Sequence, residues 1–294
     1  DPSGMSGTAV WSGELSGEYN VGVVPNGGYV LSVVTRALNA AVTRRQPPGR
    51  AHPHLDLLQA TGHYLQPSEP GSGEVTMQVL KEHGRFTMVV GELIQKARCR
   101  LHVTATFCNM SQLAINSVLK EQFVNSNLSR RTLPPSSQLR PDTVPRNLPP
   151  DGSSTFQSFQ ASIVKRTLQL QNGLLQTTDT PCADGYVAPR SQHCLDQHDV
   201  AMLADAMTPL PLLWPTYLDK ANAGGGWFPT IELSVSFHAR VPKECKELQF
   251  HYEPTCMNPG FHEEFGQLFD EQGTLLVSFR QLGLAGARQP SSKL

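Results

Sequence analysis

Three common catalytic devices are absent from the sequence. No Gly-x-Ser-x-Gly segment occurs, so nothing supports a serine nucleophile on a sharp strand-to-helix turn. No phosphate-binding loop occurs either, because the glycine run 224–226 leads into Trp-Phe-Pro instead of a nucleotide-binding helix. His52 and His54 have no carboxylate or cysteine at ligand spacing, so no metal site is predicted. Serine hydrolases, nucleotide-binding enzymes and metalloenzymes are therefore not supported by any motif.

The sequence also lacks a charge excess, a long uninterrupted apolar run and closely paired cysteines. Its 24 Lys and Arg residues oppose 25 Asp and Glu residues, so no global field favours nucleic acid or an anionic membrane surface. The most apolar long stretch, 200–218, contains Asp205 and three prolines, which argues against a membrane span. The six cysteines show neither a Cys-x-x-Cys pair nor zinc-like spacing, and we interpret them as free thiols.

Length and proline content predict two domains. A chain of 294 residues with 39% hydrophobic residues can form two modest cores. The proline-rich segment 129–154 cannot continue a helix or a central strand, and it predicts a linker or a crossing loop. The expected divisions are a first domain at 9–110, a linker at 111–155, a second domain at 156–287 and a tail at 288–294.

The first half reads as one buried helix followed by several strands. A turn at 23–28 leads into the mostly apolar run 29–38, and such a helix must be covered on most sides. Strand-like segments with turn residues between them follow at 55–65, 73–82, 86–96 and 98–107. A buried helix followed by an antiparallel meander is the hotdog plan. The segment 111–128 is predicted to be a further helix.

The second half repeats this order of elements without repeating the sequence. Segments 156–170 and 185–188 precede a predicted apolar helix at 198–213, and strands follow at 230–239, 248–255, 261–270 and 275–284. We therefore predict an α+β double hotdog that arose by divergent duplication, with two buried helices each wrapped by a curved antiparallel sheet. Because a lone hotdog leaves an exposed sheet edge, the halves are expected to share one continuous, strongly bent sheet.

Three polar residues in the second half form a candidate catalytic set. Asp205 is a lone carboxylate in the predicted apolar helix, where an unpaired charge would be costly. Thr230 opens a predicted strand beside the glycine-rich loop, and Gln281 is an amide among apolar neighbours in the last strand. An Asp, a Thr and a Gln can hold one water, and the Asp can take its proton as the water attacks a thioester carbonyl.

The order of these residues resembles the acyl-CoA thioesterase II (TesB-like) family. The matching pattern is an Asp in the helix, Thr-Ile-acidic-x-Ser-x-x-Phe-His beginning at Thr230, and Gln-x-Gly beginning at Gln281. The turn at 24–29 and the hairpin at 269–276 resemble the thioesterase-like branch of double-hotdog proteins. The resemblance covers nearly the whole chain except the linker.

This resemblance implies hydrolysis of an acyl-CoA to free acid and CoA, with Asp205, Thr230 and Gln281 as catalytic residues. It implies no metal, no other cofactor and no covalent intermediate, and it places the oxyanion against backbone N–H groups near a helix start. The first half has Gln95 at the place equivalent to Gln281 but no Asp in its helix, so we expect that half to be non-catalytic. Glu232-Leu233 and Ser236 depart from the family pattern and predict a reshaped pocket.

Other interpretations stay open at this point. Asp205 could cap or pair with a helix that begins at Thr208-Pro209. The same fold also supports a hydratase, dehydratase or cyclase acting on a secondary-metabolite intermediate, or a non-catalytic binder of acyl ligands. A hydratase would be expected to place an Asp and a His together at a helix entry, which Asp196-Gln197-His198 matches only faintly. Homo-oligomerisation is left open.

The final tripeptide, residues 292–294, predicts a destination for the chain. It reads Ser-Lys-Leu, the address that the peroxisomal import receptor recognises at a carboxyl terminus. The preceding residues 287–291 are polar and include a proline, as suits an accessible tail. We therefore expect the import receptor as a partner and the peroxisomal matrix as the location.

Overall fold

The computed structural model describes residues 7–47, 49, 53–115, 117, 143–145, 159–164, 183–189, 191, 193–206, 209, 211 and 227–286. The predicted linker at 111–155 is described only in part, so its bounds stay a prediction. The predicted tail, with residues 292–294, lies outside the described residues. Within the described part of the chain, no helix combines the length and the apolar character needed to cross a membrane.

The first half contains the predicted helix and all four predicted strands. Its elements are β1 (Thr8–Leu15), η1 (Gly17–Tyr19), β2 (Asn20–Val21), β3 (Val24–Pro25), α1 (Gly27–Arg45), β4 (Asp56–Tyr64), β5 (Gly71–Glu82), β6 (Phe86–Gln95), β7 (Arg98–Cys108) and α2 (Met110–Ile115). The short helix α2 confirms only the start of the helix predicted at 111–128, since residues 116 and 118–128 lie outside the described residues. Strand β1 was not predicted, and it pairs antiparallel with β5.

Local chemistry explains where α1 begins and why it is buried. The side chain of Asn26 accepts a hydrogen bond from Tyr29 N at 2.9 Å and so caps the helix. Apolar residues on several sides of the helix, among them Leu31, Val34 and Leu38, are fully buried. The helix runs past the predicted end to Arg44 and Arg45, whose charges suit the last turn of a helix.

The second half has the expected succession of strands around a shorter helix. Its elements are β8 (Thr143–Pro145), β9 (Phe159–Val164), β10 (Ala183–Pro189), α7 (Gln197–Leu203), β11 (Thr230–Phe237), β12 (Leu248–Asn258), β13 (Gly260–Phe269) and β14 (Leu275–Ala285). The strands predicted at 230–239, 248–255, 261–270 and 275–284 are confirmed by β11 to β14.

The predicted helix at 198–213 is wrong in its length, since α7 ends at Leu203. Asp205 lies in the turn that follows, where its N–H donates to Met202 O at 3.2 Å. A continuing α-helix would pair the carbonyl of Asp205 with the N–H of residue 209, which is a proline and has none. The carbonyl accepts instead from the side chain of Asn26 at 2.9 Å. Asp205 is therefore placed beside a helix end and not inside a helix.

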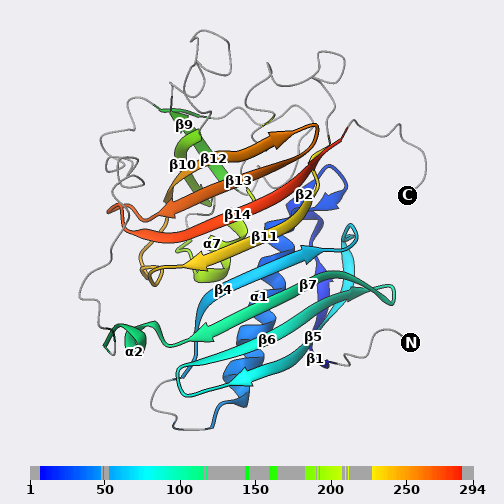
Figure 1. Cartoon of the computed structure of the whole chain (residues 1–294), viewed down its shortest axis with the longest axis vertical. Helices are drawn as coiled ribbons and strands as arrows, with labels where there is room; N and C mark the ends of the chain where they lie inside the picture. Colours follow the sequence, from blue (N-terminus) through cyan, green and yellow to red (C-terminus); the bar gives the residue numbers. More distant parts are fainter. Residues whose placement is uncertain are drawn as a thin grey trace.

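The described strands of both halves, apart from the β2-β3 ribbon, form one antiparallel sheet of twelve strands. Their order is β1-β5-β6-β7-β4-β11-β14-β13-β12-β10-β9-β8 (Figure 1). The halves join where β4 pairs with β11, in a register from Glu232↔His63 to Ser236↔Gln59. The prediction of one continuous sheet is thus confirmed, and the double-hotdog fold class with it.

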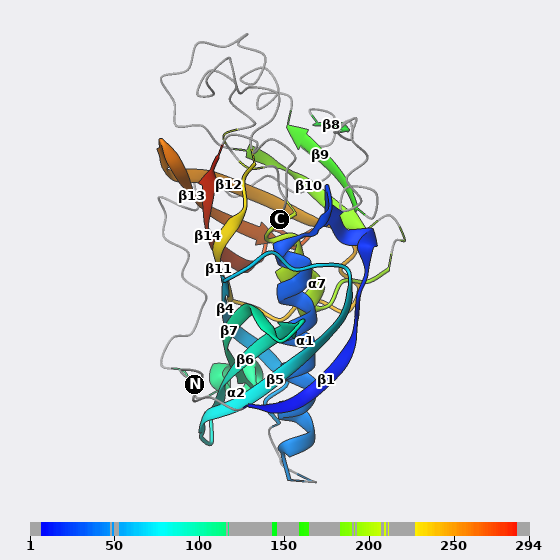
Figure 2. The same cartoon turned by 90° about the vertical axis from the view of Figure 1, so that its right-hand side faces the viewer.

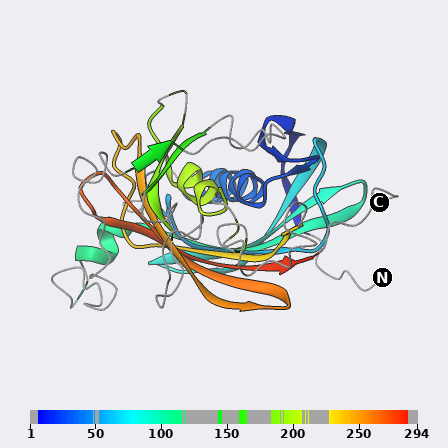
Figure 3. The same ribbon diagram turned by 90° about the horizontal axis from the view of Figure 1, so that it is seen from above.

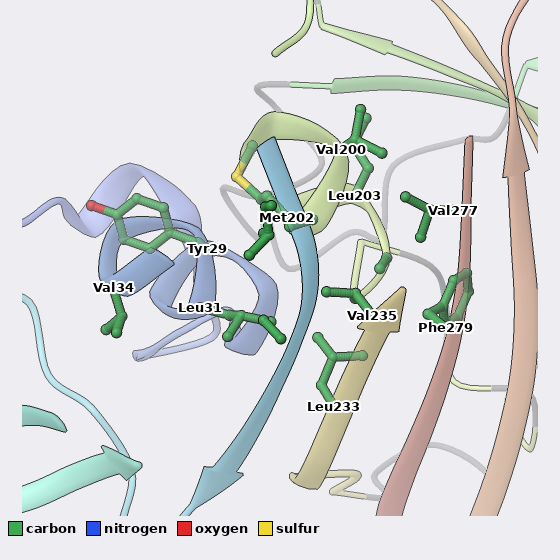
Figure 4. Packing of buried hydrophobic residues seen from close by; sticks show 14 of the residues in the cluster. Tyr29, Leu31, Val34, Val200, Met202, Leu203, Leu233, Val235, Val277 and Phe279 are labelled. Atoms are coloured by element: carbon green, nitrogen blue, oxygen red, sulfur yellow. The ribbon is translucent and has the colours of Figure 1, made fainter. Parts of the chain in front are cut away.

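The sheet curves around α1 and α7, which lie side by side on its concave side (Figures 2 and 3). Figure 4 shows buried side chains of both helices beside sheet residues of the same cluster, namely Leu233, Val235, Val277 and Phe279. These four residues mark the core face of β11 and β14. The candidate site is built at one end of this shared core.

The Asp196-Gln197-His198 segment serves the contact between the two helices. Asp196 caps α7 by accepting from His198 N at 2.8 Å, and it pairs with Arg36 of α1 at 2.6 Å. His198 lies 3.1 Å from Thr35 Oγ1, and burial lowers the pKa of its ring to about 4. These groups are accounted for by capping and helix packing.

Candidate active site

The three residues predicted to act together are in direct contact. Thr230 Oγ1 donates to Asp205 Oδ1 at 3.2 Å. Gln281 Nε2 donates to the same oxygen at 2.5 Å and to Thr230 Oγ1 at 2.7 Å. The turn after α7, the start of β11 and the middle of β14 thus converge on one carboxylate oxygen.

Strand pairing explains why Thr230 and Gln281 meet. Strand β11 pairs with β14 so that Thr230 lies opposite Gly283 and Leu233 lies opposite Gln281, with a register shift between them. Opposite residues of an antiparallel pair share one face, and residues two apart on a strand do as well. Thr230 and Gln281 are therefore neighbours on the core face, where the turn after α7 brings Asp205.

The first half of the chain contributes to this site, against expectation. The second carboxylate oxygen, Asp205 Oδ2, accepts from Gly28 N at 2.8 Å and from Asn26 Nδ2 at 3.0 Å. Asn26 and Gly28 were known only as part of the turn at 24–29, and their contact with Asp205 was missed. The first half was expected to be non-catalytic, and that stays a prediction, but this half does bind and orient the carboxylate.

Two glycines allow the start of α1 to approach Asp205 this closely. A Cβ on Gly28 would lie 2.4 Å from Met202 O and 2.8 Å from Asp205 Cβ. A Cβ on Gly27 would lie 2.8 Å from Asp205 Oδ2. Because both glycines lack one, the backbone of α1 touches the end of α7, and the positive end of its dipole faces the carboxylate. Tyr64 OH donates to Gly27 O at 2.7 Å and supports this turn.

The surroundings of Asp205 set its acidity. Burial raises the pKa of this carboxyl to about 6, while hydrogen bonds from Gly28, Thr230 and Gln281 act in the opposite direction. The charge of Glu264 on β13 raises the pKa further. At neutral pH the carboxylate is therefore ionised, with a pKa close to the range that suits a general base.

Two models of one protein family match the chain. A model of the acyl-CoA thioesterase N-terminal domain matches residues 15–108, and a model of the C-terminal domain matches residues 136–285. The chain belongs to the acyl-CoA thioesterase family. It is accordingly a thioesterase-like hydrolase, and the resemblance noted in the sequence is confirmed.

Solved structures confirm the fold of this thioesterase. A candidate thioesterase II from Thermobifida fusca is 22% identical with a TM-score of 0.73, covering 94% of this chain and 91% of that one. A hot-dog-fold protein from Alicyclobacillus acidocaldarius is 16% identical with a TM-score of 0.71, covering 97% and 96%. An acyl-CoA thioesterase II from Mycobacterium marinum is 16% identical with a TM-score of 0.59, covering 90% of each chain. Among curated proteins no sequence matches significantly.

Two other features of the thioesterase sequence have local explanations. Gln95 was predicted to be equivalent to Gln281, but that prediction is wrong: Gln95 lies on β6, whereas β7 is the strand that pairs with β4 as β14 pairs with β11. Gln95 is buried and holds the backbone of Glu69 through bonds of 2.8 and 3.0 Å. Glu232, which departs from the family pattern, binds Arg280 at 2.6 Å. Because Glu232 lies opposite Leu282, it faces away from the side of the sheet that carries Gln281. Its identity therefore does not reshape the surroundings of Asp205.

Proposed function

We propose that this thioesterase hydrolyses an acyl-CoA, or a related acyl thioester, to free acid and CoA with Asp205 as general base. The observation that carries the proposal is the convergence of Thr230 and Gln281 on one oxygen of Asp205. The other oxygen is bound by Asn26 and Gly28, so the carboxylate is fixed in orientation from both sides. A base held in this way meets the geometric demand of proton abstraction.

The reaction follows from the chemistry of these groups. A water enters among Asp205, Thr230 and Gln281, takes over part of their mutual hydrogen bonding and donates one proton toward Asp205 Oδ1. As its oxygen bonds to the thioester carbonyl carbon, the proton passes to Asp205 and a tetrahedral oxyanion forms. The carbon–sulfur bond then breaks, and the CoA thiolate takes the proton from Asp205. Free acid and CoA leave, and the carboxylate is regenerated.

A direct assay separates this function from the alternatives on the same fold. Purified protein is mixed with saturated acyl-CoAs of increasing chain length, and free thiol is measured over time. Thiol release that scales with protein concentration supports the proposal. A parallel assay gives the protein a 2-enoyl-CoA, and its hydration without thiol release would identify a hydratase. Binding of acyl-CoA without either reaction would identify an acyl-ligand binder.

Removing either water-binding partner should cost less than removing the base. Thr230→Val and Gln281→Ala each remove one hydrogen bond from a water that other groups still hold, so kcat should fall about tenfold, near 1.4 kcal/mol. The double variant should lose less than the product of the single effects, because both residues act on one water. Ser234→Ala is the matched control, since this hydroxyl on β11 bonds Thr61 at 2.9 Å. A Thr230→Val enzyme as active as the Ser234→Ala enzyme would contradict the role of Thr230.

The location of the reaction is proposed to be the peroxisomal matrix. When residues 292–294 stand at the carboxyl terminus, a fluorescent protein fused ahead of the chain should collect in peroxisomes, because the import receptor reads Ser-Lys-Leu there. Deleting the tripeptide should leave the fusion in the cytosol with unchanged thioesterase activity. An intact fusion that stays cytosolic would refute the assignment.

A further inference from the structure

Two buried titratable side chains on β13 are not used by the proposed mechanism. His262 and Glu264 are each 2% exposed, and His262 Nδ1 lies 2.9 Å from Glu264 Oε1. The contact is close enough for an ion pair but lacks the alignment of a hydrogen bond, and Nε2 of the ring has no hydrogen-bond partner. A buried polar atom without a hydrogen-bond partner is destabilising, so its retention calls for an explanation.

Strand pairing places this pair beside the candidate site. Strand β13 pairs with β14 so that His262 lies opposite Gly283 and Glu264 lies opposite Gln281. On the other side of β14, Gly283 lies opposite Thr230 of β11. Thr230, Gly283 and His262 therefore form one row across three strands, on the face that carries Gln281.

The missing side chain of Gly283 shows which way the ring extends. A Cβ on Gly283 would lie 2.5 Å from Nε2 of His262 and 2.9 Å from Cε1, so Nε2 is the ring atom closest to this place. The ring thus reaches from β13 over β14, in the direction of β11 and Thr230. Phe228 flanks it edge-on, with ring centroids 5.9 Å apart. Any larger residue than glycine at 283 would occupy the place of the ring.

A further donor beside the candidate site would serve the proposed hydrolysis. A tetrahedral intermediate requires hydrogen-bond donors for its oxyanion. The N–H of Gly28, at the start of α1, is engaged with Asp205 Oδ2, and both donors reported for Thr230 and Gln281 serve the Asp205 side of the site. The ring of His262 lies in the same row of the sheet as Thr230. Among the described side chains of this row, it is the one whose nitrogen atoms have no hydrogen-bond partner.

We propose that Nε2 of His262 donates a hydrogen bond to the thioester carbonyl oxygen as the tetrahedral intermediate forms, with Glu264 holding the ring. Glu264 lies beside Nδ1, 2.9 Å away, and keeps the ring in the position from which Nε2 donates. The ring only donates this hydrogen bond, and only Asp205 takes and returns a proton. This inference rests on the proposed thioesterase function and adds a residue that touches the reacting atoms.

The test compares two His262 variants with a matched histidine elsewhere. His262→Leu removes the donor, and kcat should fall about 10²- to 10³-fold with KM changed little. His262→Gln keeps a donor near the position of Nε2 and should retain more kcat than His262→Leu. The control is His251→Leu, because His251 is equally buried and pairs with Asp184 at 2.6 Å on β12 and β10. It should change melting temperature but not kcat per folded molecule.

Each variant is assayed with a saturated acyl-CoA and with a 3-hydroxyacyl-CoA of the same length. Equal losses of kcat on both support a contact with the thioester carbonyl. A loss confined to the 3-hydroxyacyl substrate, or a His262→Leu kcat within threefold of wild type while Asp205→Asn is inactive, overturns the inference. Wild-type protein that releases no thiol would instead overturn the proposed function. If His262→Leu does not fold, His262→Met, which has a flexible side chain without a donor, is assayed on the two substrates for the same decision.

Discussion

Replacing Asp205 with asparagine should lower kcat by about 10²- to 10⁴-fold and leave KM for acyl-CoA nearly unchanged. Asparagine keeps the size of the side chain but cannot accept the proton of the attacking water. The loss should therefore appear in the chemical step and not in substrate binding. Steady-state thiol release at several acyl-CoA concentrations measures both parameters.

The hydrogen-bond pattern predicts that the same variant folds well. Oδ1 of an asparagine can accept from Gly28 and Asn26, as Asp205 Oδ2 does at 2.8 and 3.0 Å. Its amide can then donate to Thr230 Oγ1 and to the carbonyl of a flipped Gln281 amide. Every hydrogen-bond partner of Asp205 thus keeps a hydrogen bond in the variant, because hydroxyl and amide groups can act as donors or as acceptors.

The pKa of Asp205 adds a pH dependence to this comparison. Folding raises the pKa from its ordinary value of 3.8 to about 6, so the fold favours the protonated form. The stability that this provides is fully present below pH 3.8 and is lost as the pH rises through about 6. Asparagine carries no charge to bury, so at pH 7 to 8 the variant should melt at or above the wild-type temperature.

Melting and turnover on the same preparations separate catalysis from structure. If Asp205 served only to hold the start of α1, the asparagine variant would lose melting temperature while each folded molecule hydrolysed substrate at the wild-type rate. That result would contradict the general-base assignment. Stable but inactive protein is the expected outcome.

Much of the fold was predictable because the strands carry local patterns. Segments 86–96 and 275–284 match β6 and β14 within one residue at each end, since apolar residues and turn residues bound them clearly. Strand β1 was missed because Thr8–Leu15 contains Gly13 and has a register shift between Ala9 and Trp11, which breaks its alternation.

The site was only half predictable, and the reason is sequence separation. Asp205, Thr230 and Gln281 follow one another in a recognisable order, and the structure brings them together. The bonds from Asn26 and Gly28 to Asp205 span 179 and 177 residues, and no periodicity within either segment encodes such a contact. Pro209 is a sequence signal for the end of the helix. Because it has no N–H, it cannot pair with the carbonyl of Asp205, and the side chain of Asn26 donates to that carbonyl instead.

Replacing Asn26 with aspartate should move the acid limb of kcat/KM upward by about one to two pH units. The amide Nδ2 now donates to Asp205 Oδ2 at 3.0 Å and to its carbonyl at 2.9 Å. An aspartate loses both donations and places a second carboxylate against the first. Like charges this close cannot both ionise easily, so one proton is held to higher pH and the pair titrates as a unit.

The sign of this effect follows from the role of Asp205. The general base works only when ionised, so a higher pKa shifts activity toward alkaline pH. In the wild-type enzyme the ionisable side chain that acts on the pKa of Asp205 is Glu264, and its charge already raises that pKa. With the wild-type limb expected near pH 6, the Asn26→Asp enzyme should lose about two- to fiftyfold in kcat/KM at pH 6 to 7 and recover most of that loss near pH 9.

A serine at position 26 provides the matched control. Serine, like aspartate, caps a helix well, so both variants should keep the bond from Tyr29 N that starts α1. Serine adds no charge, so Asn26→Ser should lower kcat modestly while its acid limb stays near that of wild type. Full pH profiles of kcat/KM for wild type, Asn26→Ser and Asn26→Asp, taken with melting temperatures at each pH, distinguish the effect of the added charge from the effect of losing the amide. An Asn26→Asp enzyme whose acid limb coincides with that of Asn26→Ser would show that residue 26 of the first half does not set the pKa of Asp205.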